Sequence, residues 1–93
     1  MNKYVGLIKL TEEGHEKLPK AAEVLAKTTE IVEGVGGKIF NIWAVMGVYD
    51  FVTFVEYPTE FAAFEAVTKM AELGYFTTET LPAVEMDKFL TFV

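Results

Sequence analysis

The fold of this chain is decided by residues 38–57, which have the sequence KIFNIWAVMGVYDFVTFVEY. Two runs rich in β-branched and aromatic residues flank a short segment that contains Gly47. Such a pattern is typical of a β-hairpin, because glycine adopts the positive φ that tight turns often require. We therefore predict two antiparallel strands joined by a turn at Gly47.

Both faces of this hairpin are apolar. Side chains alternate between the two faces of a strand, so a sheet with one solvated face alternates apolar and polar residues. On the first strand, one face carries Ile39, Trp43 and Val45 and the other carries Phe40, Ile42, Ala44 and Met46. On the second strand, one face carries Phe51, Val55 and Tyr57 and the other carries Val52 and Phe54. Both faces need cover, and helices supply it for only one of them.

The composition indicates self-association. The chain has 93 residues, which we assign to one domain over residues 1–93, and a domain this short buries a limited share of its surface. Hydrophobic residues make up 52% of it and aromatic residues 14%. A monomer of this size has little interior for so many apolar side chains, so we predict a homodimer or a larger homo-oligomer.

Charge and residue usage argue against several classes of function. The net charge is −6, from eight lysines, no arginine and fourteen acidic residues, which argues against a nucleic-acid partner. There is no cysteine for a disulfide or for thiol chemistry. No apolar run approaches the ~20 residues of a membrane-spanning helix, and the first residues do not have the pattern of a signal peptide. We expect a cytoplasmic protein that binds neither nucleic acid nor membrane.

The remaining segments supply two more strands and a tail. Residues 3–10 form a first strand, in which Gly6 marks a point where another backbone or a ligand comes close. Residues 75–84 form a fourth strand, and Pro82 favours an edge position for it. The apolar residues 89–93 predict a further short strand, in the same subunit or in a neighbour.

Two helices separate these strands. Pro19 favours the start of the first, which ends at Gly36 and Gly37, and Thr59 caps the second, which ends at Gly74. Residues expected to be buried recur at helical spacing. They are Ala22, Leu25, Ala26, Thr29, Val32 and Val35 in the first helix and Phe61, Phe64, Val67, Thr68 and Ala71 in the second.

The predicted order is strand, helix, strand, strand, helix, strand. This is the α+β class and the ferredoxin-like βαββαβ plan, in which both helices cover one face of an antiparallel sheet. The other apolar face would then meet the sheet of a second subunit. The expected architecture is a dimeric α/β barrel.

Three segments resemble the GYD-domain family. They are YVGLIKLTEEG at residues 4–14, MGVYD at 46–50 and TETLPA at 78–83, and the likeness extends over nearly the whole chain. The Gly-Tyr-Asp signature of the family is spread here over Gly47, Tyr49 and Asp50. The resemblance implies the dimeric α/β-barrel superfamily, and it assigns neither a reaction nor catalytic residues.

A second likeness concerns the effector-binding domains of leucine-responsive transcription regulators. The turn from Gly47 to Asp50 and the pair Thr78 and Thr80 are similar to segments of those domains, which bind amino acids between packed subunits. No DNA-binding helix-turn-helix precedes the unit in this sequence, so only ligand binding carries over. Relatives of the fold include cofactor-free monooxygenases, but a shared fold does not transfer chemistry.

Three residues are candidates for proton transfer. Asp50 could bind an amine or act as a base, although an aspartate beside a turn also accepts backbone N–H groups. Tyr49 could donate its hydroxyl to a ligand, or pack its ring at the end of the sheet. His15, the only histidine, could complete a metal site with nearby glutamates, but the usual ligand clusters are missing, so we expect no metal.

The strands give a second set of candidates, for ligand binding. A mostly apolar cavity with a few polar groups is typical of a small-molecule site. We expect the helices to cover the more aliphatic sheet face, which carries Phe40, Ile42, Ala44, Val52 and Phe54. The predicted ligand-binding residues, on the face toward the partner subunit, are Tyr4, Asn41, Trp43, Thr53 and Tyr57. The same side chains could instead form only the dimer interface.

Two classes of function therefore stay open. The first is a homo-oligomeric module that needs no cofactor and binds a small apolar or amino-acid-like ligand between the sheet and the partner subunit. The second is a cofactor-free enzyme, similar to a monooxygenase or an isomerase, that uses Asp50, Tyr49 or His15 for proton transfer. A third interpretation is that the apolar face serves assembly alone. The first class predicts a pocket without a perturbed acid or base, and the second requires one.

Overall fold

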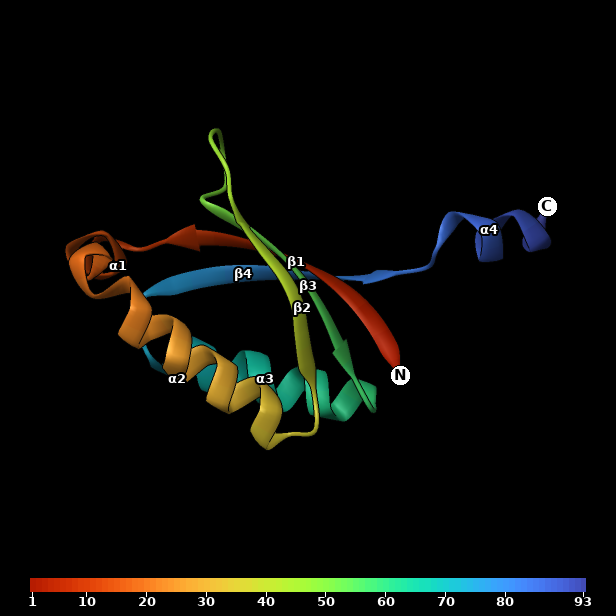
Figure 1. Ribbon diagram of the computed structural model, residues 1–93, viewed down its shortest axis with the longest axis horizontal. Helices are drawn as coiled ribbons and strands as arrows, with labels where there is room; N and C mark the ends of the chain where they lie inside the picture. The colour runs from red at the N-terminus through yellow and green to blue at the C-terminus, as the bar shows by residue number, and fades with distance from the viewer.

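The computed structural model describes residues 1–93 and has the predicted order of elements (Figure 1). The long elements are β1 (Asn2–Leu10), α2 (Ala21–Gly34), β2 (Lys38–Ala44), β3 (Phe51–Tyr57), α3 (Glu60–Glu72) and β4 (Phe76–Ala83). The short helices are α1 (Glu12–Glu16) and the 3-10 turn η1 (Leu18–Lys20) before α2, and α4 (Met86–Phe89) and the 3-10 turn η2 (Leu90–Phe92) after β4. None of these helices combines the length and the hydropathy needed to cross a bilayer.

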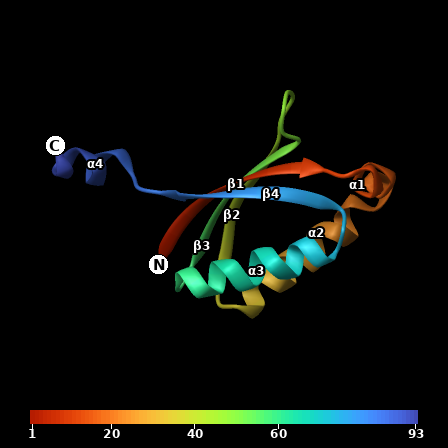
Figure 2. The same cartoon turned by 180° about the vertical axis from the view of Figure 1, so that it is seen from behind.

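The sheet is antiparallel throughout and has the strand order β2-β3-β1-β4. Helices α2 and α3 lie together on one face, which is the ferredoxin-like arrangement (Figures 1 and 2). Strand β4 is an edge strand, as Pro82 predicted. We call the face that the helices leave uncovered the open face.

The predicted hairpin is confirmed. Strands β2 and β3 pair from Lys38 with Glu56 to Ala44 with Phe51, and the Val45 N–H donates to the Asp50 carbonyl at 2.9 Å across the base of the loop. Gly47 has a φ of +130°, which confirms the positive φ expected there. The loop rises from the sheet on the side opposite to α2 and α3 (Figure 1).

A β-bulge in β2 changes which residues face the helices. Ile39 pairs with Val55 but Asn41 pairs with Phe54, so Phe40 is an extra residue in this strand. From the bulge onward the alternation shifts, and Asn41 and Trp43 share the open face with Phe40, whose ring lies 6.0 Å from that of Phe54.

The predicted division of the faces is therefore partly wrong. Ile42 faces the helices as expected, and so does Ala44, which pairs with Phe51. The prediction fails for Phe40, Val52 and Phe54, which lie on the open face. In β3 the helix-facing residues are Phe51, Thr53, Val55 and Tyr57.

The core depends on small residues of α3. Its buried residues are Ala62, Ala63, Ala66 and Met70, so the prediction that Phe61 and Phe64 are buried is wrong. These two side chains are 86% and 67% exposed. Two apolar stripes overlap along this helix, and the alanine stripe faces inward because Tyr4 and Tyr57 already fill the space beneath it, with ring centroids 5.7 Å apart.

The first long helix is buried mainly at its carboxyl end. Val32 is buried as predicted, and Thr29 and Val35 are half-buried. Ala22, Leu25 and Ala26 are exposed, so the prediction fails for these three. Ala22 and Leu25 border a cavity rather than a filled core, and Ala26 lies outside it. Of the other residues of α3 that were predicted to be buried, Val67 is half-buried, whereas Thr68 and Ala71 are exposed.

The carboxyl-terminal tail is helical, so the prediction of a fifth strand is wrong. Residues 84–93, which we call the C-terminal arm, project beyond the sheet from the end of β4 (Figures 1 and 2). The Thr91 hydroxyl donates to the Lys88 carbonyl and the rings of Phe89 and Phe92 lie 6.3 Å apart, so local contacts favour a helix. Glu85 forms an ion pair with Lys3 at the base of the arm.

Replacing Gly47 by valine should destabilise the protein by about 1–3 kcal/mol, since residues with a Cβ rarely adopt a φ of +130°. No atom lies within 4 Å of the position of the new Cβ, so backbone strain is the cause. Gly34→Ala is the control, because Gly34 lies in α2 with open space around it, and it should keep or slightly raise the melting temperature. An unchanged melting temperature for Gly47→Val would contradict the prediction.

Candidate functional site

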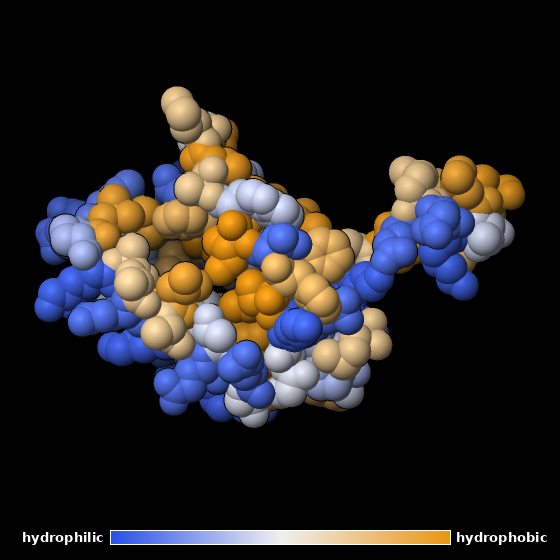
Figure 3. Space-filling view, viewed as in Figure 1, coloured by the Kyte–Doolittle hydropathy of each residue, from blue (hydrophilic) through white to orange (hydrophobic).

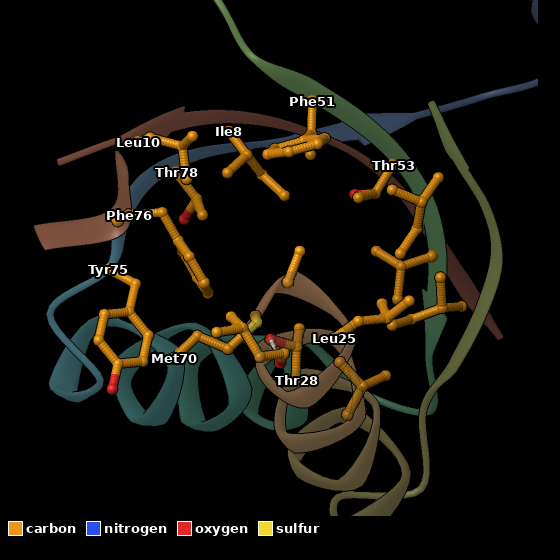
Figure 4. Close-up of a pocket in the computed structure, with 18 of the residues that line it drawn as sticks. Ile8, Leu10, Leu25, Thr28, Phe51, Thr53, Met70, Tyr75, Phe76 and Thr78 are labelled. Carbon is orange, nitrogen blue, oxygen red and sulfur yellow. Dashed lines mark hydrogen bonds between the residues drawn. The ribbon is translucent and has the colours of Figure 1, made fainter. Parts of the chain in front are cut away.

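A cavity of about 270 Å³ lies between the sheet and the two long helices (Figure 4). Seventeen of the 24 residues that line it are hydrophobic. Ile8, Phe51 and Phe76 contribute from the strands, and Leu25, Val32 and Met70 from the helices. The volume exceeds the ~150 Å³ of an engineered protein cavity that binds benzene, so the space suffices for a small organic molecule.

The cavity exists because small residues line it where large ones would fill it. Gly6 in β1, and Ala21 and Ala22 at the start of α2, border this space. At its mouth Leu18, Leu25 and Ile42 are exposed. Figure 3 shows apolar side chains gathered round a hollow on this side of the molecule. An apolar molecule therefore meets an apolar rim before it reaches the interior.

The polar groups of the cavity are mostly hydroxyls of the sheet. Thr53, Thr78 and Thr80 line it, and Figure 4 shows the side chains of Thr53 and Thr78 directed into the space. The Thr28 hydroxyl also borders it but donates to the Val24 carbonyl at 2.9 Å. Lys17 is the one charged residue of the lining, and its Nζ lies 5.8 Å from the centre of the Tyr75 ring.

Tyr57 closes one end of the cavity and is the residue whose acidity changes most. Its side chain is buried against Tyr4. Burial, and secondly electrostatic repulsion from Tyr4, raise the pKa of Tyr57 to about 12. The phenol is therefore protonated at neutral pH and cannot serve there as a base.

The five predicted ligand-binding residues divide between the two faces of the sheet. Thr53 and Tyr57 line the cavity, and Tyr4 packs directly behind them. Asn41 and Trp43 lie on the open face, where Trp43 is 50% exposed. The structure thus brings three of the five together, on the helix side of the sheet, and the bulge at Phe40 separates them from the other two.

The three candidates for proton transfer lie outside the cavity lining. The Asp50 carboxylate accepts the Leu10 N–H at 2.8 Å, and the Asp50 N–H donates to the Ile8 carbonyl at 2.8 Å. Asp50 thus has the backbone-binding role expected of it, with β1 as its partner. His15 is exposed on α1, and the structure contains no group of three or more side chains that could hold a metal ion.

Tyr49 connects the hairpin loop to the edge strand. Its hydroxyl donates to the Glu79 carboxylate at 2.8 Å. This hydrogen bond raises the pKa of Tyr49, and desolvation and the negative charge of Glu79 act in the same direction. Glu79 is exposed on β4, as expected for a charge on an edge strand.

Two residues of the site, Thr78 and Thr80, were not predicted from the residues alone. Alternation along β4 from the buried Phe76 was the available signal, because it places both threonines on the helix side. Gly6 was expected to mark a close approach, and the structure places it between Thr53 and Thr80 in the sheet.

The family comparison agrees with the resemblance found in the sequence. The GYD domain family matches residues 4–93, which is nearly the entire chain. Neither the curated proteins nor the solved structures give a match.

Alkaline pH should destabilise the protein through Tyr57. Its pKa rises from 10.0 to about 12 on folding. A group whose pKa is raised in the folded state makes its full contribution to stability at a pH below its unfolded-state pKa. It loses that contribution as the pH rises through its folded-state pKa. The free energy of unfolding should therefore fall between pH 10 and about 12, as measured by urea denaturation. Tyr57→Phe should show a smaller fall, and an identical pH dependence in that variant would contradict this role.

Proposed function

This chain belongs to the GYD-domain family, and we propose that it is a homo-oligomeric module that binds a small, apolar molecule in the cavity between its sheet and its two long helices. The observation that carries the proposal is the cavity of about 270 Å³, with its largely hydrophobic lining. Protein interiors are close-packed, and an unfilled apolar cavity lowers stability. A ligand that fills this space restores packing contacts and stabilises the folded chain.

This site differs in place from the one that the sequence predicts. The predicted pocket lies between the sheet and a partner subunit, whereas the cavity lies on the helix side of the same sheet. Thr53 and Tyr57 keep their ligand-binding role in the proposal, with Tyr4 supporting Tyr57. Asn41 and Trp43 belong instead to the surface proposed for assembly.

The chemistry of the lining supports binding over acid–base catalysis. A cofactor-free enzyme needs an acid or a base within reach of its substrate. The lining contains no carboxylate and no imidazole, and the raised pKa of Tyr57, about 12, keeps its phenol protonated. Asp50, Tyr49 and His15 all lie outside the lining.

The open face supports assembly with a second copy of the chain. Only twelve of the 93 residues are buried, and eighteen large hydrophobic residues are exposed. Phe40, Trp43 and Leu81 are exposed on strands whose helix side is already covered, and the apolar C-terminal arm extends beyond the body. In a two-fold symmetric dimer the same apolar patch of each copy forms both sides of the interface.

The cavity can be tested with indane, a rigid hydrocarbon without a polar group. Indane should raise the melting temperature of the wild-type protein and bind measurably in isothermal titration calorimetry. Ala21→Phe places a ring at the cavity and should weaken indane binding about tenfold or more, whereas Ala26→Phe puts the same ring at an exposed position of α2 outside the lining and should bind like the wild type. Failure of the wild type to bind indane would sink the proposed ligand site.

Assembly can be tested separately by placing a charge on the open face. The wild type should have at least twice the mass of the 10.4 kDa chain in light scattering at micromolar concentration. Trp43→Glu should shift it toward the monomer, because it buries an unpaired charge in the proposed interface. Phe64→Glu, at an exposed aromatic residue of α3 on the other side of the sheet, is the matched control and should not. A wild-type monomer would exclude the proposed assembly.

A further inference from the structure

Three threonines lie together on the floor of the cavity, around one glycine. Gly6, in the central strand β1, pairs with Thr53 of β3 on one side and with Thr80 of β4 on the other. Thr78 is the next helix-facing residue of β4 and pairs with Ile8. We call Thr53, Thr78 and Thr80 the threonine row. Its residues come from β3 and β4, the two strands on either side of β1, and they are the main polar feature in a hydrophobic lining.

Gly6 leaves the space that the Thr53 hydroxyl occupies. A Cβ built on Gly6 would collide with Thr53 Oγ1, and its next neighbour would be Thr53 Cβ at 3.7 Å. The hydroxyl therefore leans over the bare backbone of β1, in space that any other residue at position 6 would take. This packing is specific to the pair Gly6 and Thr53, and it fixes a hydroxyl at the centre of the cavity floor.

The hydroxyls of the threonine row have no partner within the protein. Four other threonines use their hydroxyls internally: Thr28 and Thr91 donate to helix carbonyls, and Thr11 and Thr59 accept helix N–H groups. Thr29, Thr68 and Thr77 form no such bond, and they lie outside the cavity lining. The side-chain hydrogen bonds of the structure include none from Thr53, Thr78 or Thr80. Each hydroxyl can donate one hydrogen bond and accept others, so these three remain available to a guest.

Strand propensity alone does not account for the threonine row. Threonine is favoured in strands, and so is valine, which has nearly the same shape. The two residues differ in the hydroxyl, and the hydroxyls of the threonine row reach open space, since no fully buried side-chain oxygen of the structure lacks a hydrogen-bond partner. Three accessible hydroxyls without an internal partner, grouped on one cavity floor, can therefore bind a polar group of a guest.

The charge of the lining restricts that group to a neutral one. An ion that enters an apolar cavity loses its hydration and needs a counter-charge inside. The one charged lining residue is Lys17, at the carboxyl end of α1, and its Nζ lies over the Tyr75 ring. Thr53 and Thr80 lie instead on either side of Gly6 in the sheet. A zwitterion such as an amino acid has no matching pair of charges here.

On the basis of the function proposed above, we propose that the ligand is a neutral, mainly hydrocarbon molecule with one hydrogen-bonding oxygen, such as a ketone or an alcohol, and that Thr53 and Thr80 bind this oxygen beside Gly6. The hydrocarbon part fills the space between Phe51, Phe76 and Leu25. The threonine row thereby sets the orientation of the ligand, and the apolar walls supply most of the affinity.

The test compares 1-indanone with indane, which share a ring system and differ in the ketone oxygen. Isothermal titration calorimetry of the wild type, Thr53→Val and Thr80→Val gives the affinity for each probe. Each valine variant should bind 1-indanone about two- to tenfold more weakly, as expected for one lost neutral hydrogen bond, and should bind indane as well as the wild type does. Thr53→Ser keeps the hydroxyl and should retain the affinity for 1-indanone.

Thr77→Val is the matched control, because Thr77 lies beside Thr78 in β4 but is exposed and outside the cavity lining. It should change neither affinity. If the wild type binds indane and the valine variants leave 1-indanone binding unchanged, or weaken both probes equally, the role of the threonine row is wrong and the cavity remains a binding site. If the wild type binds neither probe, the proposed function fails and this inference fails with it.

A third probe, indane-1-carboxylate, examines the alternative that Lys17 at the mouth selects an acid. The neutral ketone should bind more tightly than this anion. Tighter binding of the carboxylate that is lost in Lys17→Met would overturn the assignment of a neutral ligand.

Discussion

The packing around Tyr57 is the constraint on which the rest of this structure depends. Its ring meets Tyr4 edge-on beneath α3, and that helix can approach because it presents Ala62, Ala63 and Ala66. The link from α2 to β2 is equally tight, since a Cβ at Gly37 would lie 2.7 Å from the Tyr57 ring. One aromatic residue thus holds both long helices and two strands at one end of the sheet, where the side chains are close-packed.

The cavity is the consequence of this arrangement at the other end. Helix α2 is anchored through Val32, near its carboxyl end, while its amino-terminal half faces Ile8 and Phe51 across open space. The residues that could close this space are small, namely Gly6, Ala21 and Ala22. The helices pack tightly against the sheet at one end, and small residues leave a gap between helix and sheet at the other. The same packing that stabilises the fold therefore also leaves room for a ligand.

Much of this fold could be predicted from the sequence, because its strongest signals are local. Alternation and a glycine at the turn locate the hairpin at residues 38–57, and helical spacing locates both long helices. The faces could not be assigned with the same success. One extra residue at Phe40 shifts the alternation of β2, and in α3 hydrophobicity favours Phe61 and Phe64 over alanines that fit better beneath the helix. Which stripe is buried depends on the size of the residues across the interface, and that is tertiary information.

The two faces of β3 connect the proposed binding site with the proposed assembly surface. Thr53 points into the cavity, while its neighbours Val52 and Phe54 lie on the open face. Because the side-chain period of a strand is two, a slip of one residue in the pairing of β3 would place Phe54 in the cavity and Thr53 on the open face. The Asp50 carboxylate opposes such a slip, since it holds the start of β3 to the Leu10 N–H of β1 at 2.8 Å. Asp50 therefore acts on the cavity from outside it: by fixing the register of β3 it keeps a hydroxyl, rather than a phenyl ring, beside Gly6.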